Sequence, residues 1–169
     1  MPCGCRYGWG RRVVHVAGVT TNPGRAWVAQ QARNFLMALE ERSRSFRFLI
    51  RDRDTKFTSG FDGAFACEGV KIIRTPVQAP NANAVSERRV RSLRHECLDR
   101  ILIVSRRQLE SLLRVYVSHH NGHRPHRALQ FQPPGASQPV VALDPVRCEN
   151  VRRRDLLGGL LHEYWTAAA

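Results

Sequence analysis

Residues 49–57 read Leu-Ile-Arg-Asp-Arg-Asp-Thr-Lys-Phe, and residues 81–87 read Asn-Ala-Asn-Ala-Val-Ser-Glu. The apolar residues that lead into the first stretch predict a β-strand that ends at Asp52. The second stretch closes a loop and opens a helix, with Glu87 in the first turns of that helix. A carboxylate at a strand end and another on a helix can converge on one site, here within a very basic chain.

The composition favours a polyanionic partner. The chain has 169 residues, with 27 Lys plus Arg against 14 Asp plus Glu, and a net charge of +13. Neutralising a phosphate releases condensed counterions, and Arg also binds phosphate oxygens bidentately, so nucleic acid is the expected partner. The alternative is that a compositional bias placed Arg on the surface, where it is only solvated. The length and a hydrophobic content of 43% fit one folded domain.

Several classes of function have no support in the sequence. The chain contains no secretory or transmembrane run, and its five cysteines show no disulfide rhythm, so we expect a cytoplasmic protein that does not bind a membrane. Walker-type phosphate loops, dinucleotide fingerprints and nucleophile elbows are also absent from the sequence. ATP-driven and acyl-transfer chemistry therefore have no support in the sequence.

Apolar periodicity predicts alternating strands and helices. Phe46, Phe48 and Ile50 alternate with Arg47, Leu49 and Arg51, which is typical of a largely buried strand. The expected order is a strand at 12–20, a helix at 26–44, a strand at 46–51, a helix at 58–67 and a strand at 70–74. A loop at 75–83, helices at 84–101 and 105–121, a Pro-rich connector at 131–145 and a tail at 151–165 with a short extended segment follow.

Local signals mark two helix ends and one core position. Gly69 is expected to end the helix at 58–67, and Ser105 with Gln108 forms a capping-box pattern before the next long helix. Cys97 continues an apolar helix stripe, so we expect it in the core rather than acting as a nucleophile.

Three histidines, His119, His123 and His126, follow one another at spacings of four and three residues. On a continuous helix they could bind zinc. Gly122 and Pro125 interrupt that helix, so capping and packing are the favoured roles.

Asp52 and Glu87 suit phosphodiester chemistry. In-line attack on a shielded phosphate is supported by two divalent ions about 4 Å apart, and such ions prefer carboxylate oxygens. Two simpler interpretations remain open: Asp52 is a turn residue, and Glu87 forms an i, i+4 ion pair with Arg91.

Four motifs extend this pattern along the chain. They are a D-x-G-x-x-F-like motif at 52–57, an N-x-x-x-E-like motif at 83–87, the stretch Arg-His-Glu-Cys-Leu-Asp-Arg at 94–100, and a stretch at 116–129 similar to Y-N-x-x-R-P-H-x-x-L. In these motifs residues 48–134 resemble the catalytic core of bacterial insertion-sequence transposases and retroviral-type integrases. These are DDE recombinases with a ribonuclease H-like fold.

The resemblance implies roles for named residues. Asp52 and Glu87 would be catalytic ligands of Mg²⁺ or Mn²⁺ in a two-metal site. Asp54 stands where most relatives carry Gly, so we expect it to adopt a left-handed conformation rather than to bind metal. The residues expected to contact DNA are Lys56, Arg88, Arg91, Arg94 and Arg124; for the arginines of the helix, a merely solvated face is the alternative.

The chain departs from the family at its start. The first aspartate of the family lies on the first strand, whereas no Asp precedes Asp52 here, and residues 1–10 stand where two strands are expected. We therefore expect an α/β fold with an incomplete ribonuclease H-like core, a mixed sheet and flanking helices. The expected domains are a non-family segment at 1–11, a partial integrase core at 12–130, and a connector with a basic tail at 131–169.

Two functions follow as hypotheses, and a third has little support. The first is DNA integration by metal-dependent cleavage and strand transfer, impaired by the missing aspartate. The alternative is an inactive Arg-rich remnant that binds DNA or a full-length transposase, or that forms a homo-oligomer. A basic RNA-assembly component is disfavoured by the ordered acids and the R-P-H stretch. Sequence does not specify the DNA ends, the target or the oligomeric state.

Overall fold

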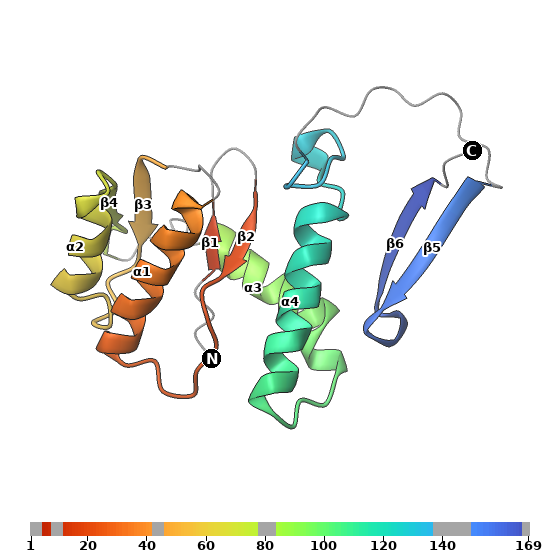
Figure 1. Ribbon diagram of the computed structural model, residues 1–169, viewed down its shortest axis with the longest axis horizontal. Coiled ribbons are helices and arrows are strands. Elements are labelled where there is room, and N and C mark those ends of the chain that lie inside the picture. Colours follow the sequence, from red (N-terminus) through yellow and green to blue (C-terminus); the bar gives the residue numbers. More distant parts are fainter. Residues whose placement is uncertain (1–4, 8–11, 42–45, 78–83, 137–149, 167–169) are drawn as a thin grey trace. The chain divides into compact units, whose positions relative to one another are not determined.

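The computed structural model describes residues 5–7, 12–41, 46–77, 84–136 and 150–166 (Figure 1). These residues form two compact units. Unit 1 contains Cys5 and the described residues from Val16 to Arg91, and unit 2 contains the remainder. Two short strands, β1 (Cys5–Tyr7) and β2 (Val14–Val16), pair with each other.

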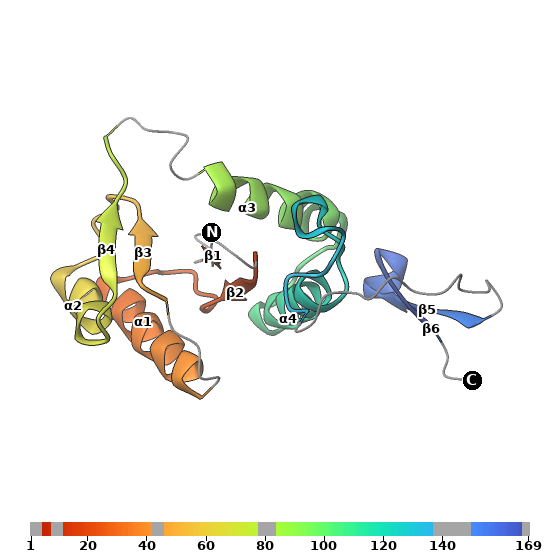
Figure 2. The same ribbon diagram turned by 90° about the horizontal axis from the view of Figure 1, so that it is seen from above.

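Unit 1 has the predicted alternation of helices and strands. Its elements are α1 (Arg25–Glu40), β3 (Phe48–Arg51), α2 (Ser59–Cys67) and β4 (Lys71–Arg74). β3 and β4 are parallel, with Phe48 paired to Lys71 and Arg51 paired to Arg74. Figure 2 shows the two strands side by side with α1 and α2 next to them. The carboxyl ends of both strands therefore lie at one edge, where Asp52 follows β3.

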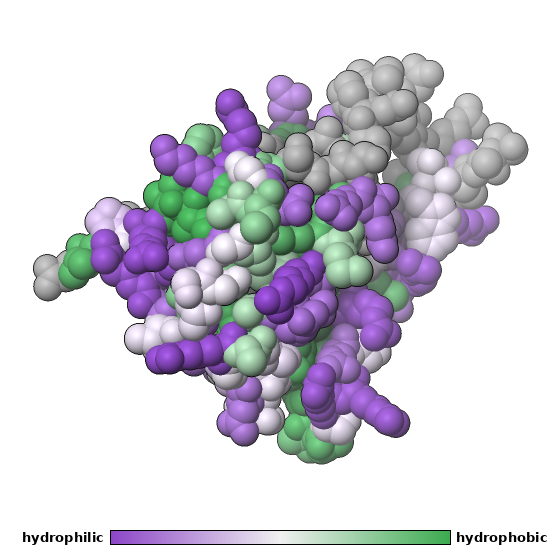
Figure 3. Space-filling model, turned by 60° about the vertical axis from the view of Figure 1, so that its left-hand side comes forward, coloured by the Kyte–Doolittle hydropathy of each residue, from purple (hydrophilic) through white to green (hydrophobic). Residues whose placement is uncertain are grey.

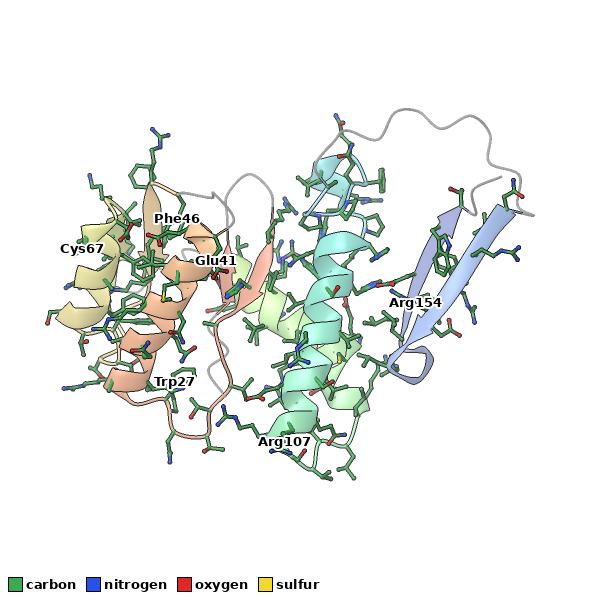
Figure 4. The ribbon with its side chains drawn as sticks, in the orientation of Figure 1. Trp27, Glu41, Phe46, Cys67, Arg107 and Arg154 are labelled. Carbon is green, nitrogen blue, oxygen red and sulfur yellow. The ribbon has the colours of Figure 1, made fainter. Side chains whose placement is uncertain are left out.

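The core of unit 1 is built where the helices cover the strand pair. Its buried members are Ala32 from α1, Leu49 from β3, Phe61 and Phe65 from α2, and Val70. The ring centroid of Phe46, labelled in Figure 4, lies 6.1 Å from that of Phe35 and 6.2 Å from that of Phe65. Val28, Phe35 and Leu36 of α1 pack against this core, which confirms the predicted apolar stripe of that helix.

The prediction that β3 is largely buried was wrong for one of its two faces. Leu49 and Arg51 are buried, whereas Phe48 is 51% exposed and Ile50 is also exposed. The reason is that α1 and α2 cover one face of the strand pair, and residues two apart on a strand share a face. Phe48 and Ile50 lie on the other face, which no described residue buries.

The end of α2 explains why a glycine follows it. Gly69 has a φ of +70°, its N–H donates to the carbonyl of Ala66, and the N–H of Val70 donates to that of Phe65. These two bonds form a Schellman motif, whose C′ position favours Gly because the left-handed region strains other residues. The predicted role of Gly69 is confirmed.

Unit 2 contains α4 (Arg106–Gly122) and the last turn of α3 (Ala84–Glu96), whose residues up to Arg91 belong to unit 1. The hydroxyl of Ser105 accepts a hydrogen bond from the backbone N–H of Gln108, so the predicted cap is confirmed. Cys97 is fully buried, and desolvation raises the pKa of its thiol, as befits a core residue. The remaining elements are the 3₁₀ turns η2 (Leu98–Arg100), η3 (Arg127–Leu129) and η5 (Leu157–Gly159), and the strands β5 (Val151–Leu156) and β6 (Leu161–Thr166).

Several element predictions need correction. The helix expected at 84–101 ends at Glu96 and continues as η2, and the single extended segment of the tail is an antiparallel hairpin of β5 and β6. The single mixed sheet is also wrong for the described residues, whose strands form three separate two-stranded sheets. The predicted connector reaches into residues 137–149, and these lie outside the described part of the chain.

The strand expected at 12–20 contains only Val14–Val16. The side chain of Asn121 explains how this short segment is held. Its Oδ1 accepts from the N–H of Val14 at 2.9 Å, and its Nδ2 donates to the carbonyl of Val14 at 2.8 Å. A side-chain amide thus takes the place of a neighbouring strand at this residue. Within the described ranges, no helix is long and apolar enough to cross a membrane.

Candidate metal and nucleic-acid site

Asp52 lies directly after β3, as predicted. Its Oδ1 accepts a hydrogen bond from the N–H of Asp54 at 3.1 Å, which closes a tight turn. Neighbouring arginines hold the backbone of this turn. Arg51 Nη1 donates to the carbonyl of Asp52 at 2.8 Å, and Arg53 Nε donates to the carbonyl of Thr75 at 2.9 Å. The loop that carries Asp52 is therefore tied to the ends of both strands.

Asp54 has a different set of contacts. Its Oδ1 accepts from the N–H of Lys56 at 2.9 Å, and its Oδ2 lies 3.5 Å from Lys56 Nζ. The expected left-handed conformation was wrong, because Asp54 is not among the residues with positive φ. Asp54 instead stabilises the turn and neutralises a lysine, which leaves Asp52 as the better candidate for a ligand.

Glu87 lies in the first turn of α3 and is exposed. The i, i+4 ion pair with Arg91, the simpler interpretation of this residue, is not found among the described contacts. Neither Asp52 nor Glu87 forms an ion pair with another described residue. Most described acids do so: Asp54, Asp62, Glu96, Asp99, Glu110, Asp155 and Glu163. The carboxylates of Asp52 and Glu87 thus have no ion-pair partner among the described residues, a property they share with Glu40, Glu41 and Glu68.

The donor chemistry of Asp52 and Glu87 suits a divalent cation, because both offer hard carboxylate oxygens. The described residues do not, however, contain a group of three His, Cys, Asp or Glu side chains that could hold a metal ion. The loop at 78–83 that precedes α3 lies outside the described residues. The carboxylates of Asp52 and Glu87 therefore suit a metal ion in their chemistry and in their lack of an ion-pair partner among the described residues. That they bind the same ion remains a prediction.

The residues predicted to bind DNA differ in their availability. Arg88 and Arg91 are exposed on α3, and Arg94 is exposed with its Nε 3.6 Å from an oxygen of Asp99. Lys56 forms an ion pair with Asp54. Figure 3 shows one face of the molecule, with hydrophilic side chains spread widely between smaller hydrophobic patches. The arginines of α3 are the more accessible part of the predicted set.

Arg124 is held by other side chains of unit 2. Its Nη1 and Nη2 bind the two carboxylate oxygens of Glu96, the second at 2.6 Å, and the hydroxyl of Tyr116 donates to Glu96 at 2.9 Å. Burial acts to raise the pKa of Glu96, but the hydrogen bond and charge of Arg124 hold that pKa below its ordinary value. This cluster joins the end of α3 to α4 and the residues after it. Contact between Arg124 and DNA stays a prediction, and the structure adds a stabilising role for this residue.

Two acids with structural roles were not singled out in the sequence. Asp62 binds Arg51 and Arg74, and Glu163 is 3% exposed with Arg154 at 2.5 Å. Arg154, labelled in Figure 4, lies opposite Glu163 in the β5–β6 pair. Each acid is far in sequence from at least one of its partners. For Asp62 the available signal was an acid in a first helical turn, with an Arg at the end of each adjoining strand.

His119 of α4 and His123, which directly follows that helix, face Glu163. His119 Nδ1 lies 3.5 Å and His123 Nε2 lies 3.6 Å from the same oxygen of Glu163, and His126 is buried. Burial lowers the pKa of His119, with Glu163 acting in the opposite direction and the charges of His123 and Arg124 adding to the decrease. These contacts agree with the packing role favoured for the histidines.

We expect the packing of the hairpin against α4 to weaken as the pH falls through about 6.5, the ordinary pKa of histidine. A lowered pKa in the packed state means that the separated state binds the proton more tightly, so this stabilisation is present above that pH and is lost below it. The indole N–H signal of Trp165 on β6, followed by NMR from about pH 8 to 5, reports the change. His119→Gln should remove the response, and its persistence in that variant would contradict the assignment.

Comparison with known proteins places these features in context. Residues 68–134, less than half of the chain, match the integrase core domain family. This segment includes Glu87, Arg88, Arg91, Arg94 and Arg124, but not Asp52. No curated protein matches the chain.

A solved structure is similar over most of the chain. It is a chain in the cryo-EM structure of the simian T-cell lymphotropic virus intasome in complex with the PP2A regulatory subunit B56 gamma. The TM-score is 0.59 and the identity is 12% over 94% of this chain and 58% of the other. The chain thus spans less than two thirds of the length of that relative, and at this identity the likeness concerns the fold. The protein is therefore similar to integrase core domains in sequence over residues 68–134, and to that intasome chain in fold over most of its length.

Proposed function

We propose that this chain takes part in DNA recombination of the transposase or integrase type, with Asp52 and Glu87 as ligands of Mg²⁺ or Mn²⁺. The observation that carries the proposal is that neither acid forms an ion pair with another described residue, whereas most described acids do. A metal pair of this kind activates an attacking oxygen and stabilises a leaving one. Bacterial insertion-sequence transposases remain the proposed family of this chain. Its proposed protein partner is a full-length transposase or a second copy of the chain itself.

The protein's own residues would bind and orient the DNA. Arg88, Arg91 and Arg94 lie on one helix that also carries Glu87, so phosphates held by these arginines would lie close to that acid. Lys56 lies two residues after Asp54 in the loop that follows β3. Arg contacts of this type position the backbone of the DNA without reading its sequence. Binding should weaken with salt, and removing one such Arg should reduce the magnitude of the salt slope by about 1.

A second candidate is a DNA-binding chain without catalysis. It is favoured by the exposed arginines of α3, Arg88, Arg91 and Arg94, which can hold phosphates whether or not a metal ion binds. This candidate predicts DNA binding without joining of DNA ends.

A strand-transfer assay with Mn²⁺ on linear DNA ends, combined with Mn²⁺ binding, tests both candidates. Asp52→Asn and Glu87→Gln should each abolish Mn²⁺ binding and any joining, whereas Asp54→Asn, the matched control, should change neither by more than about twofold. DNA binding with no joining in any variant would favour the second candidate. A wild-type chain that binds neither Mn²⁺ nor DNA would rule out both.

A further inference from the structure

One carboxylate of α2 clamps the ends of both parallel strands. Asp62 Oδ1 accepts from Arg51 Nε at 2.8 Å, and its Oδ2 accepts from Arg51 Nη2 at 2.6 Å and from Arg74 Nη2 at 3.0 Å. Arg51 and Arg74 are register partners at the last position of β3 and β4. Asp62 thus connects a helix to the edge of the strand pair that Asp52 follows.

Arg51 carries this connection to Asp52. The nitrogen of Arg51 that Asp62 does not hold, Nη1, donates to the carbonyl of Asp52 at 2.8 Å. The Arg51 side chain is only 5% exposed, and its guanidinium carbon lies 5.4 Å from the centroid of the Phe57 ring. A buried guanidinium needs a charged partner, so Asp62 determines where Arg51 can lie.

Arg74 makes a different contribution. Its side chain is 59% exposed, and it binds the same oxygen of Asp62 without a described bond to the turn at Asp52. A pair this exposed adds little stability. Arg74 therefore binds Asp62 as Arg51 does, but it has no described hydrogen bond that links Asp62 to Asp52.

We infer that Asp62 is a positioning residue for Asp52, acting through the Arg51 guanidinium, an inference that rests on the proposed function. The buried pair holds the Asp52 carbonyl, while Asp52 Oδ1 holds the N–H of Asp54. With the backbone of Asp52 held on one side and its Oδ1 on the other, the carboxylate keeps one orientation before a cation arrives. Fixing a ligand in this way lowers the entropic cost of binding.

The test begins with metal-free protein and the amide signal of Asp54 in ¹H–¹⁵N NMR. Asp62→Asn should shift that signal and speed its hydrogen exchange, because the buried Arg51 loses its counterion. Arg51→Lys is a second variant, in case Asp62→Asn fails to fold; it keeps the charge but loses the fork that bonds both partners. Arg74→Gln is the control and should leave the Asp54 signal in place. An Asp54 amide that is the same in wild type, Asp62→Asn and Arg51→Lys would overturn the inference.

Mn²⁺ binding to the same proteins then separates this inference from the proposed function. Asp62→Asn should weaken Mn²⁺ binding by about tenfold, as loss of a supporting residue around a metal typically does, whereas Arg74→Gln should not weaken it. A wild-type chain that binds no Mn²⁺ would contradict the proposed function. The Asp54 amide signal of the metal-free protein would still decide whether Asp62 positions Asp52. Equal Mn²⁺ affinity in wild type and folded Asp62→Asn would count against Asp62.

Discussion

Replacing Phe65 with Ala is expected to lower the free energy of unfolding of unit 1 by about 4 kcal/mol. The Phe65 ring is 0% exposed, and its centroid lies 5.1 Å from that of Phe61 and 6.2 Å from that of Phe46. The substitution removes these contacts and leaves a cavity that α1 and β3 cannot close without moving. Because domains are stable by only about 5–15 kcal/mol, this variant should unfold at a much lower urea concentration.

Phe48→Ala is the matched control. It makes the same chemical change as Phe65→Ala, but on the face of β3 that α1 and α2 do not cover. Phe48 is exposed, so its loss should cost less than about 1 kcal/mol. Urea unfolding followed by circular dichroism gives both values. A larger cost for Phe48→Ala than for Phe65→Ala would contradict the assignment of Phe48 to the exposed face of β3.

Replacing Glu96 with Gln is expected to destabilise unit 2 by about 2 kcal/mol. Glu96 accepts from both terminal nitrogens of Arg124 and from the hydroxyl of Tyr116, and each of these groups would lose a charged partner. The half-buried guanidinium would remain without its counterion, which costs more than the loss of an exposed pair. Thermal unfolding at neutral pH measures the effect.

Glu110→Gln is the control for Glu96→Gln. Glu110 pairs with Arg106 at 2.7 Å on the exposed side of α4, so its loss should cost less than about 0.5 kcal/mol. The pH dependence adds a second check. Since the pKa of Glu96 is held below its ordinary value of 4.5, the stabilisation is present above that pH and is lost as the pH falls below it. Equal loss of stability on acidification in wild type and Glu96→Gln would show that Glu96 contributes nothing.

Much of the local structure followed from sequence pattern. The order of strands and helices from Val14 to Gly122 was predicted, because apolar periodicity and helix-end residues act over a few neighbouring positions. Gly69 and Ser105 were found for the same reason, since each bonds to backbone groups within four residues. The position of Asp52 directly after a strand was confirmed on the same basis.

Features that depend on distant residues were not predicted. The exposed face of β3 depends on which side α1 and α2 cover, and alternation along a short strand fits either side equally well. The β5–β6 hairpin was not predicted. Its turn places Gly158 and Gly159 among leucines, and the flanking residues lack the alternating apolar pattern that predicts two strands. Glu163 acquired its role only when the hairpin placed it against His119 and His123.

The sequence by itself determined the charge of the protein, the alternation of its elements and the two positions, Asp52 and Glu87, where acids stand in motifs similar to those of integrases. Only the tertiary structure decided which acids are neutralised. Asp52, Asp54 and Asp62 carry the same side chain, but folding places a cation within ion-pair distance of the carboxylates of Asp54 and Asp62. No described cation forms an ion pair with the carboxylate of Asp52, although Arg51 bonds to its backbone carbonyl. The physical reason is that ion pairing depends on distance in space, which sequence spacing does not specify once the chain turns back on itself.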